Sequence, residues 1–303
     1  MKTQIETNGA SIFAVAEIIA AGILWGLIAI FVKPLAAAGL SPLHVTELRS
    51  LVAATGLFVL ICIKNPALLR AAPIDLPLFA GSGILSIVMF NICYFATMES
   101  APVSVAVILL YTSPFFVIIL SRLFFKEKIT GAKIIALFLA FAGCALSVGF
   151  RQSYVPMLAI ITGLCSGLCY GLYTIFGAAA LRKYSALTFT FYTFLFACIA
   201  LPFAAADIWT IVAAAPETIG FAVALGVVST IAPFLLYTHG LRNIQAGKAA
   251  VLAFSEPAAA CVTGVVVFKE NFSALNFLGL LLILVGICII SIDKNKAHVA
   301  NSN

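Results

Sequence analysis

Residues 83–143 read GILSIVMFNICYFATMESAPVSVAVILLYTSPFFVIILSRLFFKEKITGAKIIALFLAFAG, and much of this pattern recurs 143 positions later in the chain. At most aligned positions the second copy exchanges one apolar residue for another. The identical pairs include Gly83 with Gly226, Ser86 with Ser229, Tyr94 with Tyr237, Pro114 with Pro257, Lys126-Glu127 with Lys269-Glu270, and Gly143 with Gly286. An apolar bias does not readily place a proline and a Lys-Glu pair in one register. The pattern indicates an internal duplication, and we expect five-helix copies over residues 12–150 and 155–292.

The composition is that of a membrane protein. Of 303 residues, 63% are hydrophobic and 9% are charged, and the mean hydropathy is +1.18. Soluble domains have about 25% charged residues. A bilayer core about 30 Å thick needs roughly 20 apolar residues for each helical crossing. Such runs lie near residues 13–35, 43–63, 76–98, 102–124, 132–150, 155–179, 185–205, 218–240, 247–268 and 274–292. The sequence therefore predicts an all-α, multi-pass protein of the inner membrane with ten transmembrane helices.

The lysine and arginine residues predict the orientation. With the N-terminus in the cytoplasm, thirteen of these residues fall on the inner side and three, Lys33, Arg151 and Lys269, on the outer side. This distribution follows the positive-inside rule and places both termini in the cytoplasm. The net charge of +6 results from this bias, so it does not indicate a nucleic-acid partner.

Five helices in each copy imply that the second copy enters the membrane from the opposite side. Lys126-Glu127 is then expected at the cytoplasmic face and Lys269-Glu270 at the outer face. Inverted repeats of this kind place a substrate site near the middle of the membrane, at the interface between the repeats. They also permit alternating access by rocking of one repeat against the other.

The chain resembles the EamA-type ten-helix carriers of the drug/metabolite transporter superfamily. The resemblance covers residues 12–292 and is carried by Trp25-Gly26, Glu47-Leu48-Arg49, Ser255-Glu256-Pro257 and Phe268-Lys269-Glu270. It implies a secondary carrier of amino acids, amines or carboxylates, with a cavity among helices 1, 3, 4, 6, 8 and 9. Export is favoured over uptake. One departure is that the first copy has Thr112-Ser113-Pro114 where the second has the acidic residue.

Glu256 is the first candidate for a substrate or proton site, because ionisable groups inside a membrane are costly and usually functional. Pro257 is expected to remove a backbone hydrogen bond and bend its helix, and Pro114 to do the same in the first copy. Paired breaks point to a binding region. The alternative is that Glu256 only forms a hydrogen bond to a neighbouring helix.

Arg49 and Glu47 are two residues apart, about 200° around a helix, so they cannot share one face. The resemblance favours Arg49 for the cavity, where its guanidinium would suit a carboxylate. The alternative is a structural ion pair near the lipid headgroups. Which of the two residues faces the cavity is left open by the sequence.

Aromatic and amide groups complete the predicted substrate site, although ordinary packing is the alternative for each. The full set of candidates is Trp25, Arg49, Asn91, Tyr111, Tyr170 and Glu256. The motifs Gly22-x-x-x-Gly26 and Gly163-x-x-x-Gly167-x-x-x-Gly171 are interpreted as helix-packing motifs, because small residues let helices approach closely.

The sequence offers no catalytic, metal or cofactor motif. HExxH, GxSxG and Walker A patterns are absent, and the eight cysteines lie in apolar spans. Cys165 and Cys169 share a helical face but have no histidine or carboxylate nearby in sequence. We therefore expect a transporter, not an enzyme, with a small-molecule substrate and a lipid bilayer as partners. The alternatives are a sugar-phosphate or lipid-linked sugar carrier or flippase and, from another class, a membrane enzyme or receptor. Proton coupling and oligomeric state stay open.

Overall fold

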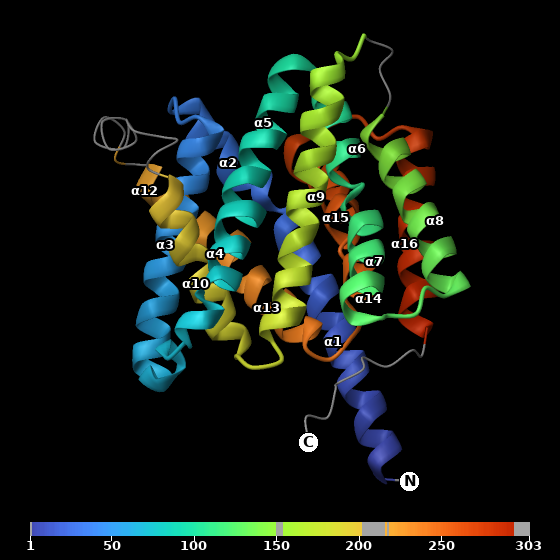
Figure 1. Cartoon of the computed structure of the whole chain (residues 1–303). Helices are drawn as coiled ribbons and strands as arrows, with labels where there is room; N and C mark the ends of the chain where they lie inside the picture. Colours follow the sequence, from blue (N-terminus) through green and yellow to red (C-terminus); the bar gives the residue numbers. More distant parts are fainter. Residues whose placement is uncertain (1, 150–153, 202–215, 217, 294–303) are drawn as a thin grey trace.

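The computed structural model describes residues 2–149, 154–201, 216 and 218–293, with side chains from residue 12 onward. Every regular element in these residues is a helix, and they form one bundle with a common long direction (Figure 1). Nine helices of this part of the chain are long and apolar enough to span a membrane, and a tenth apolar helix, α10, is shorter. The predicted all-α fold with ten helical crossings is confirmed.

The first five crossings consist of α1 (Lys2–Gly26) with α2 (Ile28–Ala37), α3 (Pro42–Lys64), α4 (Leu76–Gly83) with η3 (Ile84–Met89) and α5 (Phe90–Ser100), α6 (Val103–Leu110) with α7 (Ser113–Phe125), and α8 (Gly131–Val148). The next five consist of α9 (Met157–Ala180), α10 (Ala186–Ala200), α12 (Thr218–Gly226) with η5 (Val227–Ile231) and α13 (Ala232–Leu241), α14 (Ala246–Leu252) with α15 (Ser255–Phe268), and α16 (Ala274–Ile292). The end of the predicted span 185–205 lies outside the described residues.

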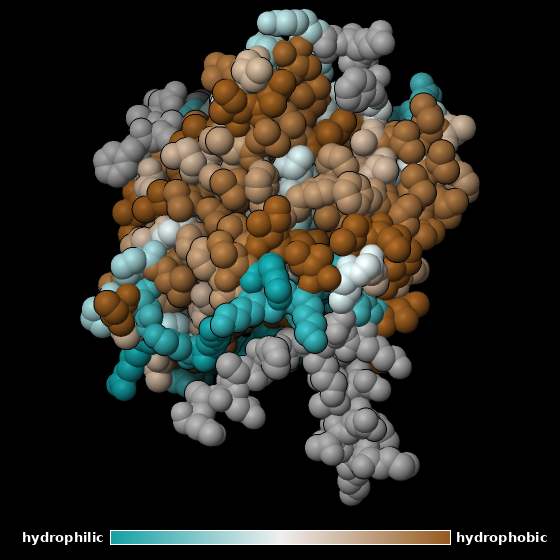
Figure 2. Space-filling view, turned by 45° about the vertical axis from the view of Figure 1, so that its right-hand side comes forward, coloured by the Kyte–Doolittle hydropathy of each residue, from teal (hydrophilic) through white to brown (hydrophobic). Residues whose placement is uncertain are grey.

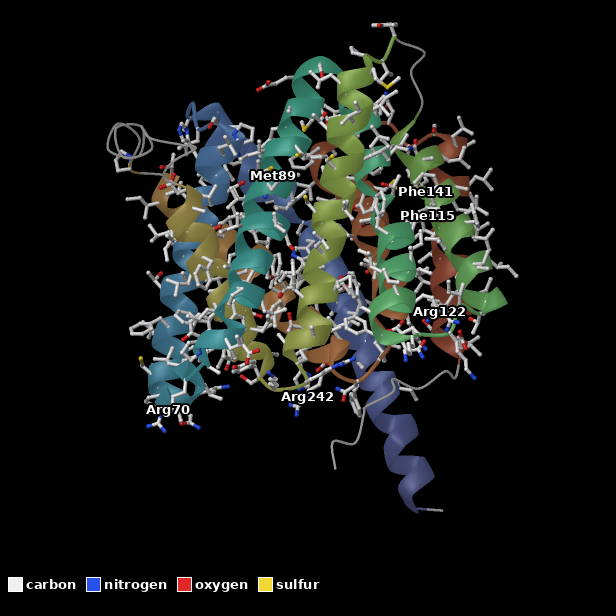
Figure 3. The ribbon with its side chains drawn as sticks, viewed as in Figure 1. Arg70, Met89, Phe115, Arg122, Phe141 and Arg242 are labelled. Atoms are coloured by element: carbon white, nitrogen blue, oxygen red, sulfur yellow. The ribbon has the colours of Figure 1, made fainter. Side chains whose placement is uncertain are left out.

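The surface of the bundle separates apolar from polar residues along its long direction. Figure 2 shows apolar residues over most of one face and hydrophilic residues gathered toward its lower end. Arg70, Arg122 and Arg242 lie at this same end (Figure 3). Arg151, Lys294 and Lys296, which entered the charge argument, lie outside the described residues.

The crossings that hold Pro114 and Pro257 are interrupted at matching positions, as the paired breaks predicted from the sequence require. α6 and α7 are separated by Tyr111 and Thr112, and α14 and α15 by Ala253 and Phe254. In the second break the backbone N–H of Glu256 donates to the carbonyl of Ala253 at 2.9 Å, a tighter turn than the α-helical one. The break places Glu256 in the first turn of α15, next to freed backbone groups.

Two crossings contain a wide π-helical segment at matching positions. Ile84–Met89 forms one and Val227–Ile231 the other, and residue 84 aligns with residue 227 in the duplication. Such segments hold more residues per turn than the α-helix and occur frequently at functional sites.

The glycine motifs pack as the sequence predicts. A Cβ atom added at Gly26 would lie 2.7 Å from the backbone nitrogen of Ala260 on α15. A Cβ atom added at Gly167 would lie 2.7 Å from the carbonyl oxygen of Leu109 on α6. Backbone-to-backbone contact therefore joins α1 to α15 and α9 to α6.

Substitution of Gly167 by alanine is expected to lower the free energy of unfolding by about 1–3 kcal/mol, the usual effect of overpacking a filled interface. Gly220→Ala is the matched control, because an added Cβ there meets nothing within 4 Å. The midpoint of thermal unfolding in detergent would measure both variants. Equal midpoints for the two would contradict close packing at Gly167.

Candidate functional site

One cavity of about 740 Å³ lies inside the bundle, and its walls come from both copies. All six residues predicted for the substrate site line it: Trp25, Arg49, Asn91, Tyr111, Tyr170 and Glu256. Among its exposed lining residues are Lys33 on α2, Val103 at the start of α6 and Glu270 after α15, so the mouth is at that end. The size and the mixture of aromatic walls with a few polar groups are typical of a small-molecule site.

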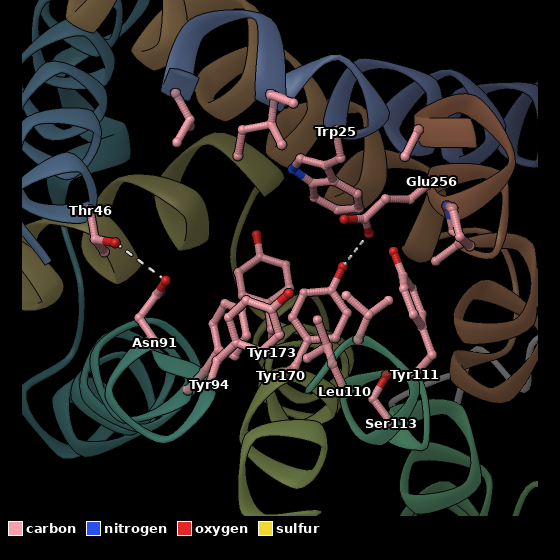
Figure 4. A pocket seen from close by; sticks show the side chains of 18 of the residues that line it. Trp25, Thr46, Asn91, Tyr94, Leu110, Tyr111, Ser113, Tyr170, Tyr173 and Glu256 are labelled. Carbon is pink, nitrogen blue, oxygen red and sulfur yellow. Dashed lines mark hydrogen bonds between the residues drawn. The ribbon is translucent and has the colours of Figure 1, made fainter. Parts of the chain in front are cut away.

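The carboxyl group of Glu256 lies against two tyrosines (Figure 4). The hydroxyl of Tyr170 on α9 donates to Oε2 of Glu256 at 2.8 Å. Tyr111, at the break between α6 and α7, directs its hydroxyl at the same carboxyl group, and Trp25 lies beside it (Figure 4). Glu256 therefore combines two predicted properties, because it faces the cavity and also forms a hydrogen bond to a neighbouring helix.

Arg49 faces the cavity from α3. Its Nε donates to Oγ1 of Thr230 at 3.1 Å, and its guanidinium carbon lies 6.0 Å from the ring centroid of Phe234. No acidic side chain of the described residues forms an ion pair with it. The guanidinium is thus oriented by a neutral hydroxyl on the π-helical segment, and its charge is not neutralised by a bonded carboxylate.

Glu47 lies on a different face of α3 from Arg49, as the two-residue spacing predicts. Its side chain is outside the cavity lining and only 6% of the residue is exposed. Its Oε2 has no hydrogen-bond partner among the described residues. The alternative of a structural ion pair for Arg49 is not found among the described residues, and of the two residues it is Arg49 that lines the cavity.

Asn91 lies on the cavity wall but both ends of its amide are already bonded. Its Oδ1 accepts from Oγ1 of Thr46 at 3.2 Å, and its Nδ2 donates to the carbonyl of Ile87 at 2.7 Å (Figure 4). A substrate would share these groups instead of finding them free. Asn91 consequently offers less binding energy than Arg49 or Glu256.

Two tyrosines of the cavity wall form hydrogen bonds to threonine hydroxyls, and the sequence did not predict these bonds. The Tyr173 hydroxyl lies 2.6 Å from Oγ1 of Thr238, and the Tyr237 hydroxyl 2.7 Å from Oγ1 of Thr174. Trp25 packs edge-on against the Phe234 ring, with centroids 5.1 Å apart.

Thr230, the partner of Arg49, had only a slight signal in the sequence: it follows Ser229, which aligns with Ser86.

No metal centre is formed by the residues that the structure describes, since no three His, Cys, Asp or Glu side chains lie close enough together. The eight cysteines, all within the described part of the chain, are unpaired. The site is therefore built from hydrogen-bonding, charged and aromatic groups.

A bundle of ten apolar helices around a central polar and aromatic cavity is the architecture of a membrane transporter. The chain belongs to the EamA-like transporter family, whose model matches residues 12–149 and 157–292. It is a multi-pass protein of the cell membrane, and it is a transporter and not an enzyme.

Several relatives are transporters. An uncharacterized transporter of Archaeoglobus fulgidus is 30% identical over 83% of this chain and 89% of its own length. The threonine/homoserine exporter RhtA of Salmonella typhimurium is 28% identical over 79% of this chain and 78% of its own. The pseudopaline exporter CntI of Pseudomonas aeruginosa is 26% identical over 77% and 84%.

A solved crystal structure has the same fold. Its TM-score is 0.73 at 18% identity, and the superposition covers 91% of this chain and 96% of that one.

Proposed function

We propose that this transporter is a secondary carrier that exports small zwitterionic metabolites of the amino-acid type. In this proposal Arg49 binds the carboxylate of the substrate and Glu256 binds its ammonium group. The observation that carries the proposal is the presence of two opposite charged groups in one cavity without an ion pair between them.

The chemistry of the two ends supports this assignment. A guanidinium presents several N–H donors in a plane, and Nε is already used on Thr230, so the remaining donors are available to a carboxylate. At the other end, Glu256 lies among Trp25, Tyr111 and Tyr170, and aromatic faces attract organic cations. A zwitterion would satisfy both charges at once, whereas a pure amine or acid would satisfy one.

Relatives support export as the direction. RhtA is named a threonine/homoserine exporter and CntI a pseudopaline exporter. Both transport activities belong to those proteins, and we extend only the direction and the polar class of substrate to this chain.

The proposal is tested by counterflow in proteoliposomes with matched sets of compounds. Each set contains an amino acid, the amine that lacks its carboxylate, and the acid that lacks its amino group. We expect the amino acid to compete about 10-fold or more better than either partner, because each lost charge-assisted bond costs roughly 1.5–3 kcal/mol. Equal competition by all three compounds would contradict zwitterion binding.

We further propose that the two copies are inverted in the membrane. The loop after α7 contacts the start of α14 through Glu127, whereas the loop holding Glu270 follows the end of α15. Since α14 and α15 form one crossing, the two Lys-Glu loops lie at opposite ends of it. This arrangement supports alternating access to the cavity.

Single cysteines introduced at Lys128 and at Asn271, in a background without native thiols, are expected to react from opposite sides of the membrane. The Lys128 position should react from the cytoplasmic side, because it follows α7, whose last turn carries Arg122 at the end of the bundle that also holds Arg70 and Arg242. A membrane-impermeant maleimide on right-side-out and inside-out vesicles measures this. Reaction of both positions from one side would contradict the inverted arrangement.

A further inference from the structure

Two glutamates at matching positions of the duplication are bonded very differently, and we propose that they are reciprocal latches of the transport cycle. Glu127 holds the inner end of the cavity closed in this structure. Glu270 is the corresponding latch of the outer end and is unbound in this structure. It binds the backbone N–H groups of Val103 and Ser104 when the outer end closes. The proposal rests on the inverted, alternating-access transport proposed above.

The closed latch consists of one carboxylate on two backbone amides. Glu127 Oε1 accepts from the N–H of Ala246 at 2.7 Å, and Oε2 accepts from the N–H of Gly247 at 3.2 Å. These amides are at the start of the crossing that carries Glu256. The side chain of Glu127 is only 12% exposed, so water competes weakly for its oxygens.

Lys133 stabilises the closed latch by pairing with the same carboxylate. Its Nζ lies 3.4 Å from Glu127 Oε2 and donates to Gln245 Oε1 at 2.6 Å. The lysine side chain is 2% exposed, and a buried charge of this kind is stable only with its partners in place. Opening the inner end therefore requires the carboxylate, the lysine and the two amides to separate together.

The backbone that presents each glutamate is the same in both copies. Lys126 and Lys269, which precede the two glutamates, have φ angles of 56° and 58°. The N–H of Glu127 donates to the carbonyl of Ser121, and the N–H of Glu270 to that of Gly264, which is the aligned residue. The second loop is thus already shaped as the first one is.

Glu270, in contrast, is largely exposed and is not bonded to a helix start as Glu127 is. Its side chain is 63% exposed and pairs only loosely with the exposed Lys33, at 3.8 Å. In the duplication Ala246 and Gly247 align with Val103 and Ser104, the residues that begin α6. Val103 and Glu270 both line the cavity at its mouth, and the residue before Val103 is a proline, which supplies no side-chain cap. Glu270 and the start of α6 therefore both lie at the open end of the cavity.

The two latches differ in one supporting residue. Asn276 stands where the first copy has Lys133, and it donates through Nδ2 to the carbonyl of Ser147 at 2.6 Å instead of approaching Glu270. The outer latch consequently lacks a buried cation behind its carboxylate. This asymmetry favours the state described here, with the inner end closed and the outer end open.

The test measures the balance between the two states in membranes without substrate. Native Cys261, which lines the outer part of the cavity, reports outer access in a background that lacks the other thiols. Ala250→Cys, on the cavity wall one turn after Gly247, reports inner access when a membrane-impermeant maleimide is supplied from the cytoplasmic side only. Glu127→Gln is expected to raise the inner labelling rate about tenfold and to lower the outer rate.

Glu270→Gln, added to Glu127→Gln, is expected to reverse most of that shift, because it removes the opposing latch. Glu99→Gln is the matched control, since it changes an exposed glutamate at the end of α5 and should reverse nothing. A background that keeps only Cys144, which is buried, should stay unlabelled and so excludes unfolding as the cause.

Unchanged labelling in Glu127→Gln, or an inner rate that stays raised when Glu270→Gln is added, would overturn the latch proposal. The result is independent of the substrate, because none is present. If the zwitterion assignment is wrong, the labelling pattern still stands. If the latches are wrong, amino-acid binding to the unaltered protein is unaffected.

Discussion

Arg49→Ala is expected to weaken substrate affinity about 10- to 150-fold while leaving the amount of protein in the membrane unchanged. A hydrogen bond to a charged group contributes roughly 1.5–3 kcal/mol, and each 1.4 kcal/mol corresponds to about tenfold in affinity. The guanidinium is the only charged partner that we assign to the substrate carboxylate. Folding should be preserved because the bonded partner of Arg49 is the neutral hydroxyl of Thr230.

Two further variants sharpen this test in the counterflow assay. Arg49→Lys keeps the charge but loses the planar set of donors, so it should bind more weakly than the unaltered protein and more tightly than the alanine variant. Arg242→Ala, which removes an exposed arginine at the basic end of the bundle, should leave transport unchanged. Asn91→Ala should have a smaller effect than Arg49→Ala, because its amide already bonds Thr46 and Ile87. Normal kinetics in Arg49→Ala would remove it from the site.

Glu256→Gln separates two roles that the cavity allows for this carboxyl group. If Glu256 takes up a proton on one side of the membrane and releases it on the other, the amide should still bind and exchange substrate. Accumulation driven by a pH gradient should then fall to the level seen without a gradient. If Glu256 instead binds the substrate ammonium, the amide should lose about 10- to 150-fold in affinity at every pH.

Glu47→Gln is the matched control, since it neutralises another membrane-buried carboxyl group that lies outside the cavity. It should retain both affinity and the response to a pH gradient. Full activity of Glu256→Gln with an unchanged pH response would contradict both roles and show that Glu256 serves only the structural hydrogen bond with Tyr170.

The architecture was predictable because it depends on patterns that repeat along the chain. Apolar runs gave the crossings, and the glycine spacing gave the close contacts of α1 and α9. Helix periodicity also separated Glu47 from Arg49. Each of these properties is local in sequence, so one chain is sufficient to see it.

The bonds inside the cavity were not predictable, because they join residues far apart in sequence. Thr230 meets Arg49 across 181 positions, and Tyr170 meets Glu256 across 86. Threonine and tyrosine are common in such helices, so nothing marks the particular ones that meet. The break near Pro257 was predictable, but its form was not, because a proline alone removes one hydrogen bond, whereas the chain here changes to a tighter turn for two residues.

The wide turns at Ile84–Met89 and Val227–Ile231 bear on the history of the molecule. A π-helical turn holds an extra residue relative to an α-helical one, and it is rare in proteins. Two independent insertions at aligned sites would be a coincidence, so the matching turns support the duplication that we infer from the sequence. In that inference, the half-length ancestor already carried this turn. Its two descendants have since diverged, so that one now holds Asn91 through Ile87 and the other holds Arg49 through Thr230.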